Sequence, residues 1–335
     1  KGVSDINEKS KNNFWKRLPV EKMQLSDGSI SDTAHNPNFE LAETKTTKAI
    51  QKHSMNIGGK ERNYQTDEAY LMLGKARYYD QRFVPALDAF NYILYKYPTS
   101  SNINPAKIWR EKTNMRLGND ALVIKNISKL LEDQKLKHQV FADANALLAA
   151  SFLNLEEKDS AVAKIKLAIE FTKVNQEKAR YRFILGQLYQ ELGYKDSADV
   201  AYQSVIDMNR KADRRFVIQA HAKKAELFDY QSGDFVAFEN TFDKLIKDRE
   251  NRPYKDLIFH QMALFYDKQN NQEAALEFYN ASLRSNSKDT YLTASNYRNL
   301  GNMYFRDAAN PQAAKYYDST LVKLNPKSRE FIKIE

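Results

Sequence analysis

The sequence is organised by a pattern of small and large residues that is clearest between Leu185 and Tyr202. Leu185 and Gly186 lie in a first amphipathic stretch, and after a break at Gly193 a second stretch carries Ala198 and Tyr202. Residues four apart lie on one face of a helix, so each stretch presents a small residue beside a large one. This pattern predicts an antiparallel helix pair in which rings pack above small residues.

The same pattern occurs six more times along the chain, for example at Leu73-Gly74 with Phe90 and at Leu300-Gly301 with Tyr317. The copies start near Asp67, Asn104, Ala142, Ala179, Ile218, Asp256 and Ala294, which gives a period of about 37 to 39 residues. The tetratricopeptide repeat (TPR), a helix pair of about 34 residues, has this small and aromatic pattern with a late proline. We therefore predict an all-α, right-handed TPR superhelical solenoid.

The repeats predict four regions. Residues 1–36 lack periodicity and form an extended or partly disordered arm, whose apolar anchors Phe14-Trp15 and Leu18-Pro19-Val20 we expect to lie on the solenoid. Residues 37–55 form an orphan capping helix, residues 67–327 form about seven TPR-like helix pairs, and residues 328–335 begin a further helix or a tail. Because the chain opens at Lys1 rather than Met, we expect it to be a piece of something longer.

Composition excludes several classes of protein. No apolar run approaches the roughly 18 residues that span a bilayer. The chain contains no cysteine, which excludes disulfides, thiol nucleophiles and cysteine zinc sites and agrees with an oxidising compartment such as a periplasm. The net charge of +9 favours acidic proteins, anionic lipid headgroups or nucleic acid as partners.

No pattern of residues indicates catalysis or a cofactor. The five histidines are His35, His53, His138, His221 and His260, and no two of them lie four residues apart as metal ligands on one helix do. The G-x-S-x-G nucleophile motif is absent, and pairs such as Glu156-Glu157 fall in expected turns. We predict that the protein is not an enzyme and that it binds no metal or cofactor.

Helical-repeat solenoids bind partners mainly through the outward face of each first helix. In the register given above, this face carries aromatic, arginine and amide side chains, which suit a peptide and its carboxylates. The candidate groove residues are Tyr78, Tyr79, Arg180, Phe183, Gln187, Tyr230, Arg298, Asn302, Phe305 and Arg306. Their other interpretation, residue by residue, is an ordinary solvated surface.

A second candidate surface is basic. Between Met208 and Lys224, with the single acid Asp213, it comprises Arg210, Lys211, Arg214, Arg215, Lys223 and Lys224. Nucleic-acid binding requires exposed aromatic residues among such charges, and Phe216 is needed for helix packing instead. We interpret the patch first as a solvated turn between repeats, then as a surface for an anionic protein or envelope, and last as a nucleic-acid site.

The sequences Asp159-Ser160-Ala161, Asp196-Ser197-Ala198 and Asp318-Ser319-Thr320 resemble acceptor sites for O-glycans in Bacteroidota envelope proteins. The first two precede expected second helices, where Asp and Ser cap helices well. Helix capping is the preferred interpretation.

A more specific resemblance covers about the first third of the chain. Residues 36–98, from NPNFELAETKTTKAIQKHSMNIGGK to NYILYKYP, together with Phe14–Glu21 (FWKRLPVE) and Ala106–Asn114 (AKIWREKTN), resemble the SprE/PorW family. These are TPR lipoproteins of the type IX secretion and gliding system of Bacteroidota. The resemblance implies a lipoprotein at the periplasmic face of the outer membrane, whose anchoring cysteine is not in this sequence. It supplies no catalytic residues.

Together these observations predict a non-catalytic scaffold that links periplasmic motor and ring components with the outer-membrane translocon in protein transport. Two alternatives remain. One is a cytoplasmic TPR adaptor that captures acidic peptide tails, and the other is a nucleic-acid-binding repeat protein, whose affinity would fall steeply with salt. Which partner binds, which face binds it and the stoichiometry are left open by the sequence.

Overall fold

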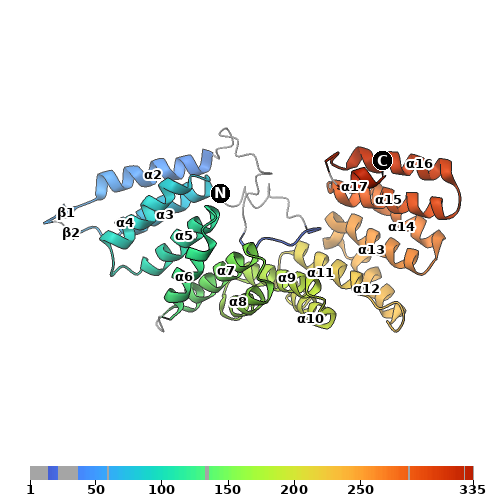
Figure 1. The fold of residues 1–335 in the computed structure, drawn as a ribbon, viewed down its shortest axis with the longest axis horizontal. Helices are drawn as coiled ribbons and strands as arrows, with labels where there is room; N and C mark the ends of the chain where they lie inside the picture. Colours follow the sequence, from blue (N-terminus) through green and yellow to red (C-terminus); the bar gives the residue numbers. More distant parts are fainter. Residues whose placement is uncertain are drawn as a thin grey trace. The chain divides into compact units, whose positions relative to one another are not determined.

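The computed structural model describes residues 14–21, 37–58, 60–132, 136–285, 287–327 and 329–334. The chain divides into two compact units, Lys1–Ala198 (unit 1) and Asp199–Glu335 (unit 2), and the boundary falls within α10 (Lys195–Ile206). Within each unit, successive helices pack as antiparallel hairpins (Figure 1). The fold is the all-α TPR solenoid that the repeats predict, with one two-stranded hairpin of two residues per strand added.

Unit 1 consists of one leading helix and a series of helix pairs. Its elements are α2 (Pro37–His53), β1 (Asn56–Ile57), β2 (Lys60–Glu61), α3 (Thr66–Tyr79), α4 (Phe83–Lys96), α5 (Ile103–Arg116), α6 (Asp120–Leu131), α7 (His138–Asn154), α8 (Lys158–Phe171) and α9 (Asn175–Glu191).

Unit 2 continues the series of pairs and adds two short 3₁₀ helices. Its elements after α10 are η1 (Asn209–Lys211), α11 (Arg214–Glu226), α12 (Phe235–Lys247), η2 (Arg249–Tyr254), α13 (Lys255–Lys268), α14 (Gln272–Arg284), α15 (Thr290–Arg306), α16 (Asn310–Lys323) and α17 (Arg329–Ile334).

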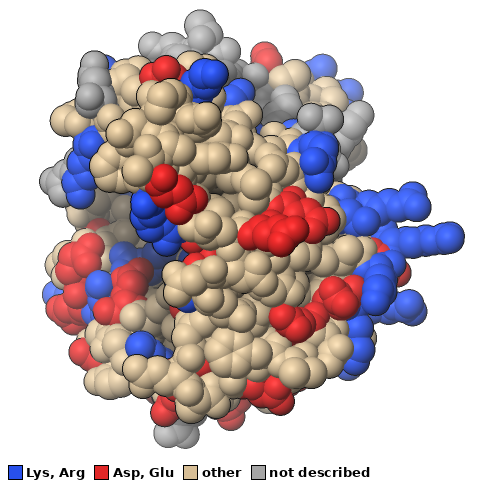
Figure 2. Space-filling model, turned by 90° about the vertical axis from the view of Figure 1, so that its right-hand side faces the viewer, with Lys and Arg blue, Asp and Glu red and all other residues tan. Residues whose placement is uncertain are grey.

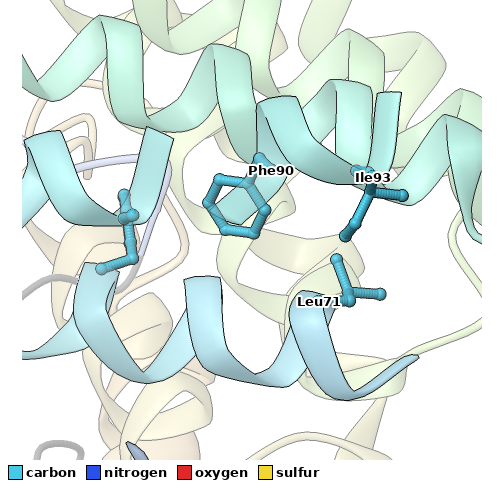
Figure 3. Packing of buried hydrophobic residues seen from close by; sticks show 6 residues of the cluster. Leu71, Phe90 and Ile93 are labelled. Atoms are coloured by element: carbon cyan, nitrogen blue, oxygen red, sulfur yellow. The ribbon is translucent and has the colours of Figure 1, made fainter. Parts of the chain in front are cut away.

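The small and large residues of the repeat face each other across each hairpin. In the α3–α4 pair the ring of Phe90 lies directly over Gly74, so close that a Cβ atom built there would be 2.4 Å from the ring. Leu71 and Ile93 pack beside this ring, and Figure 3 shows all three side chains between the two helices. In the α15–α16 pair Tyr317 lies over Gly301 in the same way, and a Cβ atom built on Gly301 would be 2.7 Å from the ring. Ring-over-glycine packing thus closes the hairpin in both units.

In six of the seven helix pairs that the structure describes, the turn contains a residue with positive φ, and the turn between α11 and α12 has none. Gly118 and Gly193 occupy this position with φ of 81° and 84°, where glycine has no steric penalty. In other pairs the position is held by residues that carry a side chain, namely Gln81, Glu156, Asn270 and Ala308, with φ between 57° and 62°. The turn geometry is therefore imposed by the packing of the helix pair.

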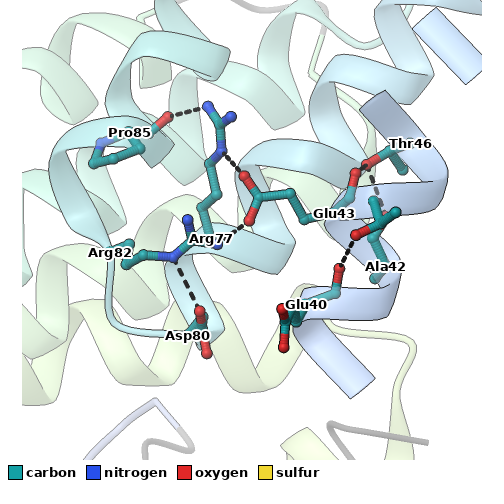
Figure 4. Close-up of polar contacts among 9 residues, drawn as sticks. Glu40, Ala42, Glu43, Thr46, Arg77, Asp80, Arg82 and Pro85 are labelled. Carbon is teal, nitrogen blue, oxygen red and sulfur yellow. Dashed lines mark hydrogen bonds and ion pairs between the residues drawn. The ribbon is translucent and has the colours of Figure 1, made fainter. Parts of the chain in front are cut away.

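Helix α2 covers the first pair of unit 1. Phe39 is buried and its ring stacks on that of Tyr79 at 5.6 Å. Glu43 accepts a hydrogen bond from Arg77 Nε (2.9 Å) and pairs with Arg82, and the second arm of Arg77 donates to the main-chain oxygen of Pro85 (3.0 Å) (Figure 4). The contacts of Glu43 fasten α2 to α3 and to Arg82, the N-cap residue of α4, and Phe39 covers Tyr79 on the first pair.

One sequence interpretation needs correction. Asp159 and Ser160 do not cap α8, because the residue at the N-cap position is Glu157 and no side chain forms the cap hydrogen bond. Asp159 lies in the first turn of the helix, where its charge interacts favourably with the helix dipole.

Candidate protein-binding face

In unit 1 the first helices of the pairs, among them α3, α5 and α9, form one face. Residues Phe14–Glu21, which we call the N-terminal segment, occupy this face. This segment forms neither helix nor strand. Its apolar side chains Phe14, Leu18 and Val20 are 6%, 1% and 5% exposed, as buried as the helix cores. The expectation that these anchors lie on the solenoid agrees with their burial.

Arg180 and Gln187 of α9 hold the main chain of the segment. Arg180 is itself 2% exposed, and it donates from Nε and Nη2 to the carbonyl oxygen of Pro19 (3.0 and 2.6 Å) and from Nε to that of Val20 (3.2 Å). Gln187 makes two bonds, donating to the Lys16 carbonyl oxygen and accepting from the Leu18 amide, both at 3.0 Å. Charged donors make the stronger hydrogen bonds, so Arg180 is the main polar anchor.

Phe183 and Glu191 of α9 make two further contacts with the segment. The ring of Phe14 meets that of Phe183 edge to face, with centroids 5.3 Å apart. Arg17 pairs with Glu191 at 2.8 Å, and Glu191 is also held by Lys158 at 2.8 Å. From Arg17 to Val20 the segment therefore runs from the C-terminal end of α9 back toward Arg180, while Phe14 lies against the middle of that helix.

The last residue of the segment, Glu21, reaches α3 and α5. Its carboxylate accepts a hydrogen bond from Tyr78 Oη (2.9 Å) and pairs with Lys112 Nζ (3.3 Å). The lysine and glutamate side chains are only 20% and 13% exposed. Burial acts to lower the pKa of Lys112, but the carboxylates of Glu21 and Asp143 outweigh it and raise that pKa above its ordinary value. Burial followed by the Glu21 charge raises the pKa of Tyr78 well above its usual range.

The carboxylate site has aromatic and cationic walls. Lys112 and Lys75 both lie over the ring of Trp109, at 4.7 and 5.1 Å from its centroid. Burial, followed by the charge of Lys112, lowers the pKa of Lys75. Tyr79 packs edge-on against both Trp109 and Tyr78. We call the residues that contact the segment the segment-binding face, and they are Tyr78, Lys112, Arg180, Phe183, Gln187 and Glu191.

Four of the five groove residues predicted in unit 1 belong to this face. The exception is Tyr79, which packs against Tyr78 and Trp109. Lys112 and Glu191 were not singled out in the sequence. The acidic Glu21 immediately after the apolar anchors was the one available signal for a basic partner in the groove.

The groove residues predicted in unit 2 have other contacts. Arg298 pairs with Glu330 and donates to Ser295 Oγ (3.1 Å), and Arg306 pairs with Asp267. The remaining three are also described: Asn302 accepts from Tyr317 Oη (2.9 Å), Tyr230 packs among Phe228, Phe235 and Phe265, and Phe305 is 63% exposed.

Most charges of the predicted basic patch are neutralised by neighbours. Arg214 donates to Asn251 (2.7 Å) and Asp248 (2.6 Å), and Arg215 pairs with Asp213. Lys223 pairs with Glu226, and Lys224 with Asp199. Arg210 and Lys211 are exposed, Arg210 at the limit of an ion pair with Glu250 (4.0 Å). Figure 2, which looks at the right-hand side of Figure 1, shows Asp and Glu scattered over one face and Lys and Arg projecting at one edge.

Within the described residues, no three His, Asp or Glu side chains converge as a metal site requires, and His35 lies outside the described residues. Those residues also include no helix that is both long and apolar enough to cross a bilayer.

Comparison with known proteins agrees with the fold. A tetratricopeptide repeat family model matches residues 179–211 and 258–289, and the first match begins at the expected start of the fourth repeat. The chain is a tetratricopeptide-repeat solenoid. A TPR protein from Parabacteroides merdae superposes with a TM-score of 0.50 at 14% identity, covering 81% of this chain and 98% of that one. The C-terminal part of a TPR-containing protein from Cytophaga hutchinsonii gives 0.50 at 13% identity, with 89% and 94% covered. No curated protein sequence matches the solenoid.

Proposed function

We propose that this TPR solenoid is a non-catalytic scaffold that binds partner proteins, and that the segment-binding face of unit 1 receives an extended stretch of the partner. TPR folds are typical of protein-interaction scaffolds. One observation carries the choice of face: Arg180 and Gln187 bond to main-chain atoms of a non-helical segment at four residues, Lys16, Leu18, Pro19 and Val20. Main-chain bonds with side-chain pockets are how extended peptides are recognised.

We further propose that this scaffold works in the type IX secretion and gliding system, at the periplasmic face of the outer membrane. The resemblance of residues 36–98 and of the N-terminal segment to the SprE/PorW family supports this. In that role the repeats hold motor, ring and translocon components at fixed spacing, without chemistry of their own.

The experiment is capture from detergent-solubilised envelopes, with the 335-residue chain as bait, light crosslinking and mass spectrometry. We expect motor, ring or translocon proteins, with crosslinks at α3, α5 and α9, and loss of those crosslinks with Arg180→Ala and Gln187→Ala together. The control is Arg306→Ala, which removes an arginine predicted for the groove face of unit 2. Crosslinks confined to unit 2, or unaffected by the double substitution, contradict the choice of face.

A cytoplasmic adaptor for acidic peptides is the second candidate, and the carboxylate of Glu21 held by Lys112 and Tyr78 favours its ligand chemistry. Cell fractionation of the native, full-length protein separates the two proposals, because the adaptor is recovered with the cytosol and the secretion scaffold with the envelope.

A further inference from the structure

We propose that the N-terminal segment is a displaceable occupant of the segment-binding face, and that the partner which displaces it is a protein with an extended acidic segment, whose carboxylate takes the place of Glu21. This inference rests on the proposed function and adds to it the chemistry of the partner and the means by which access is controlled.

Between the described residues, the hydrogen bonds that Arg180 and Gln187 make with the segment end on its main chain. Their partners are the carbonyl oxygens of Lys16, Pro19 and Val20 and the amide of Leu18. Any polypeptide in the same non-helical conformation presents those atoms. The face is therefore built to hold a segment of protein, and another chain can satisfy the same donors and acceptors.

Side chains select the sequence at three places. The ring of Phe14 packs edge to face with that of Phe183, and Leu18 and Val20 are buried against the solenoid. The carboxylate of Glu21 pairs with Lys112 and accepts a hydrogen bond from Tyr78. A replacement thus needs an aromatic residue, an aliphatic residue about four positions later and an acid three positions after that. This is the spacing of the N-terminal segment itself.

The charge of the face requires the acid. Lys112 is four-fifths buried, and Lys75 shares the Trp109 ring with it. If the segment leaves, Lys112 loses its ion pair with Glu21 while remaining against the aromatic wall, and an unpaired buried charge is costly. An incoming carboxylate restores the pair, whereas a neutral or basic segment leaves it unpaired. Asp143, the other carboxylate that raises the pKa of Lys112, stays with the solenoid in either state.

Attachment to the same chain gives the occupant an advantage in concentration. Fifteen residues, 22–36, separate the segment from α2 in the sequence. Attachment through so few residues corresponds to an effective concentration on the order of millimolar. A partner in solution must therefore bind more tightly than the segment, or add contacts elsewhere, and weak binders are excluded.

The test uses a fluorescein-labelled peptide with the sequence of residues 13–22 (NFWKRLPVEK) and fluorescence anisotropy on the 335-residue chain. Phe14→Ala with Leu18→Ala in the protein removes two anchors of the occupant and leaves the face unchanged. We expect the peptide to bind this opened chain at least about tenfold more tightly than the wild type, because competition is relieved. A peptide with Gln in place of Glu21 binds the opened chain about tenfold less tightly, and so does the unchanged peptide when the protein carries Lys112→Gln.

A second experiment compares the chain before and after a crosslink, and it tests displacement even if the opened chain folds poorly. The chain has no cysteine, so Arg17→Cys with Glu191→Cys introduces two unique thiols, one in the segment and one in α9. A flexible bismaleimide joins them and fixes the occupant in place. We expect peptide binding before crosslinking and none after it, with circular dichroism unchanged.

Each other outcome overturns a stated part. Equal affinity for the wild type and the opened chain, or binding that survives the crosslink, overturns displacement but leaves the proposed function standing. Failure of the peptide to bind a correctly folded opened chain overturns the proposed function of this face. Equal affinity for the Glu21 and Gln peptides overturns the choice of an acidic partner. If the wild type forms a dimer in light scattering, and the opened chain does not, the occupant is a second copy and the proposed partner is wrong.

Discussion

In unit 1, Arg180 and Gln187 bond to main-chain atoms of the N-terminal segment, whereas in unit 2 Arg298 and Arg306 form ion pairs with Glu330 and Asp267. All four residues were predicted from one register to face the binding groove. In unit 1 they hold a segment from outside the helix pairs. In unit 2 the two arginines join α15 to α17 and to α13.

The two units differ in the residues that contact these side chains, and not in the type of the side chains themselves. Arg180 is 2% exposed because Pro19, Val20 and their neighbours cover it, while the side chain of Arg306 is half exposed. Arginines predicted for the same groove face therefore hold an added segment in one unit and join helices in the other. A repeat register identifies the face, and only the neighbours of each side chain identify its role.

The largest effect that tests this comparison is expected for Arg180→Ala. Hydrogen bonds to charged groups contribute about 1.5–3 kcal/mol each, so loss of the Arg180 bonds weakens docking of the segment by about 3 kcal/mol, or roughly a hundredfold. The measurement is amide exchange of the peptide that covers residues 14–21, followed by mass spectrometry, which should speed up by that factor. The matched Arg306→Ala breaks an exposed pair, should cost under about 1 kcal/mol in global unfolding and should leave that exchange unchanged. Equal effects of the two substitutions would abolish the distinction between the faces.

A second test compares the glycines that close a hairpin in each unit. Gly74→Ala pushes a Cβ into the ring of Phe90, which is fully buried beside Leu71 and Ile93 and cannot move aside. Overpacking of about 3 kcal/mol, less about 1 kcal/mol for the better helix propensity of alanine, leaves a loss of about 2 kcal/mol. Gly301→Ala meets the ring of Tyr317, which is only partly buried and can shift, so the net change should be near zero.

Tryptophan fluorescence can separate these effects, because both tryptophans, Trp15 and Trp109, lie in unit 1. In urea titrations, Gly74→Ala should move the fluorescence midpoint to lower urea. Gly301→Ala should leave both the fluorescence and the circular dichroism transitions in place. A larger loss for Gly301→Ala would mean that Tyr317 is held as firmly as Phe90.

The helix pairs could be predicted because the size of the repeated residues determines how the two helices pack. Gly74 and Gly301 leave room for a neighbouring helix to approach closely. The rings of Phe90 and Tyr317, in the second helix of each pair, are large enough to fill that room. The turns were harder. Gly118 and Gly193 indicate positive φ, but Gln81, Glu156 and Ala308 adopt it as well, and nothing in those residue types indicates a left-handed conformation.

The binding face could be predicted in part for a different reason. The register places Arg180, Phe183 and Gln187 on the outward side of a first helix, and the apolar anchors Leu18 and Val20 indicate a segment that needs burial. That the anchors meet those side chains depends on the path of the chain between residues some 160 positions apart, such as Val20 and Arg180. No local pattern contains that information. Lys112 was missed because a lysine in a helix is ordinarily a solvated surface residue.

The smallest effect is a pH dependence that should distinguish unit 2. His260 of α13 is 1% exposed, and its Nδ1 donates to Asn296 Oδ1 (2.6 Å). Asn296 in turn donates to Ser282 Oγ (2.7 Å), and Ser282 donates to the carbonyl oxygen of Asp256 (2.7 Å). This chain of bonds joins α13, α14 and α15 around a neutral imidazole. Burial lowers the pKa of His260 to about 4, against the Asn296 hydrogen bond that acts to raise it, with Arg298 adding to the lowering.

A pKa that is lower in the folded state than the ordinary 6.5 means that the unfolded chain binds the proton more readily. The stability contributed by neutral His260 is therefore complete above about pH 6.5 and is lost as the pH falls toward 4. Between pH 7.5 and 5.5 the loss should be roughly 1 kcal/mol. Urea unfolding followed by circular dichroism at the two pH values measures it. His260→Gln is expected to remove about half of the dependence, because His221 of the same unit has an equally lowered pKa, while tryptophan fluorescence, which reports unit 1, is unaffected. Burial also lowers the pKa of His221 to about 4, helped by Lys224 and Arg214, so His221→Gln is the matched substitution. If His221→Gln removes the pH dependence and His260→Gln does not, the acid sensitivity of unit 2 belongs to α11 rather than to the buried network of α13, α14 and α15.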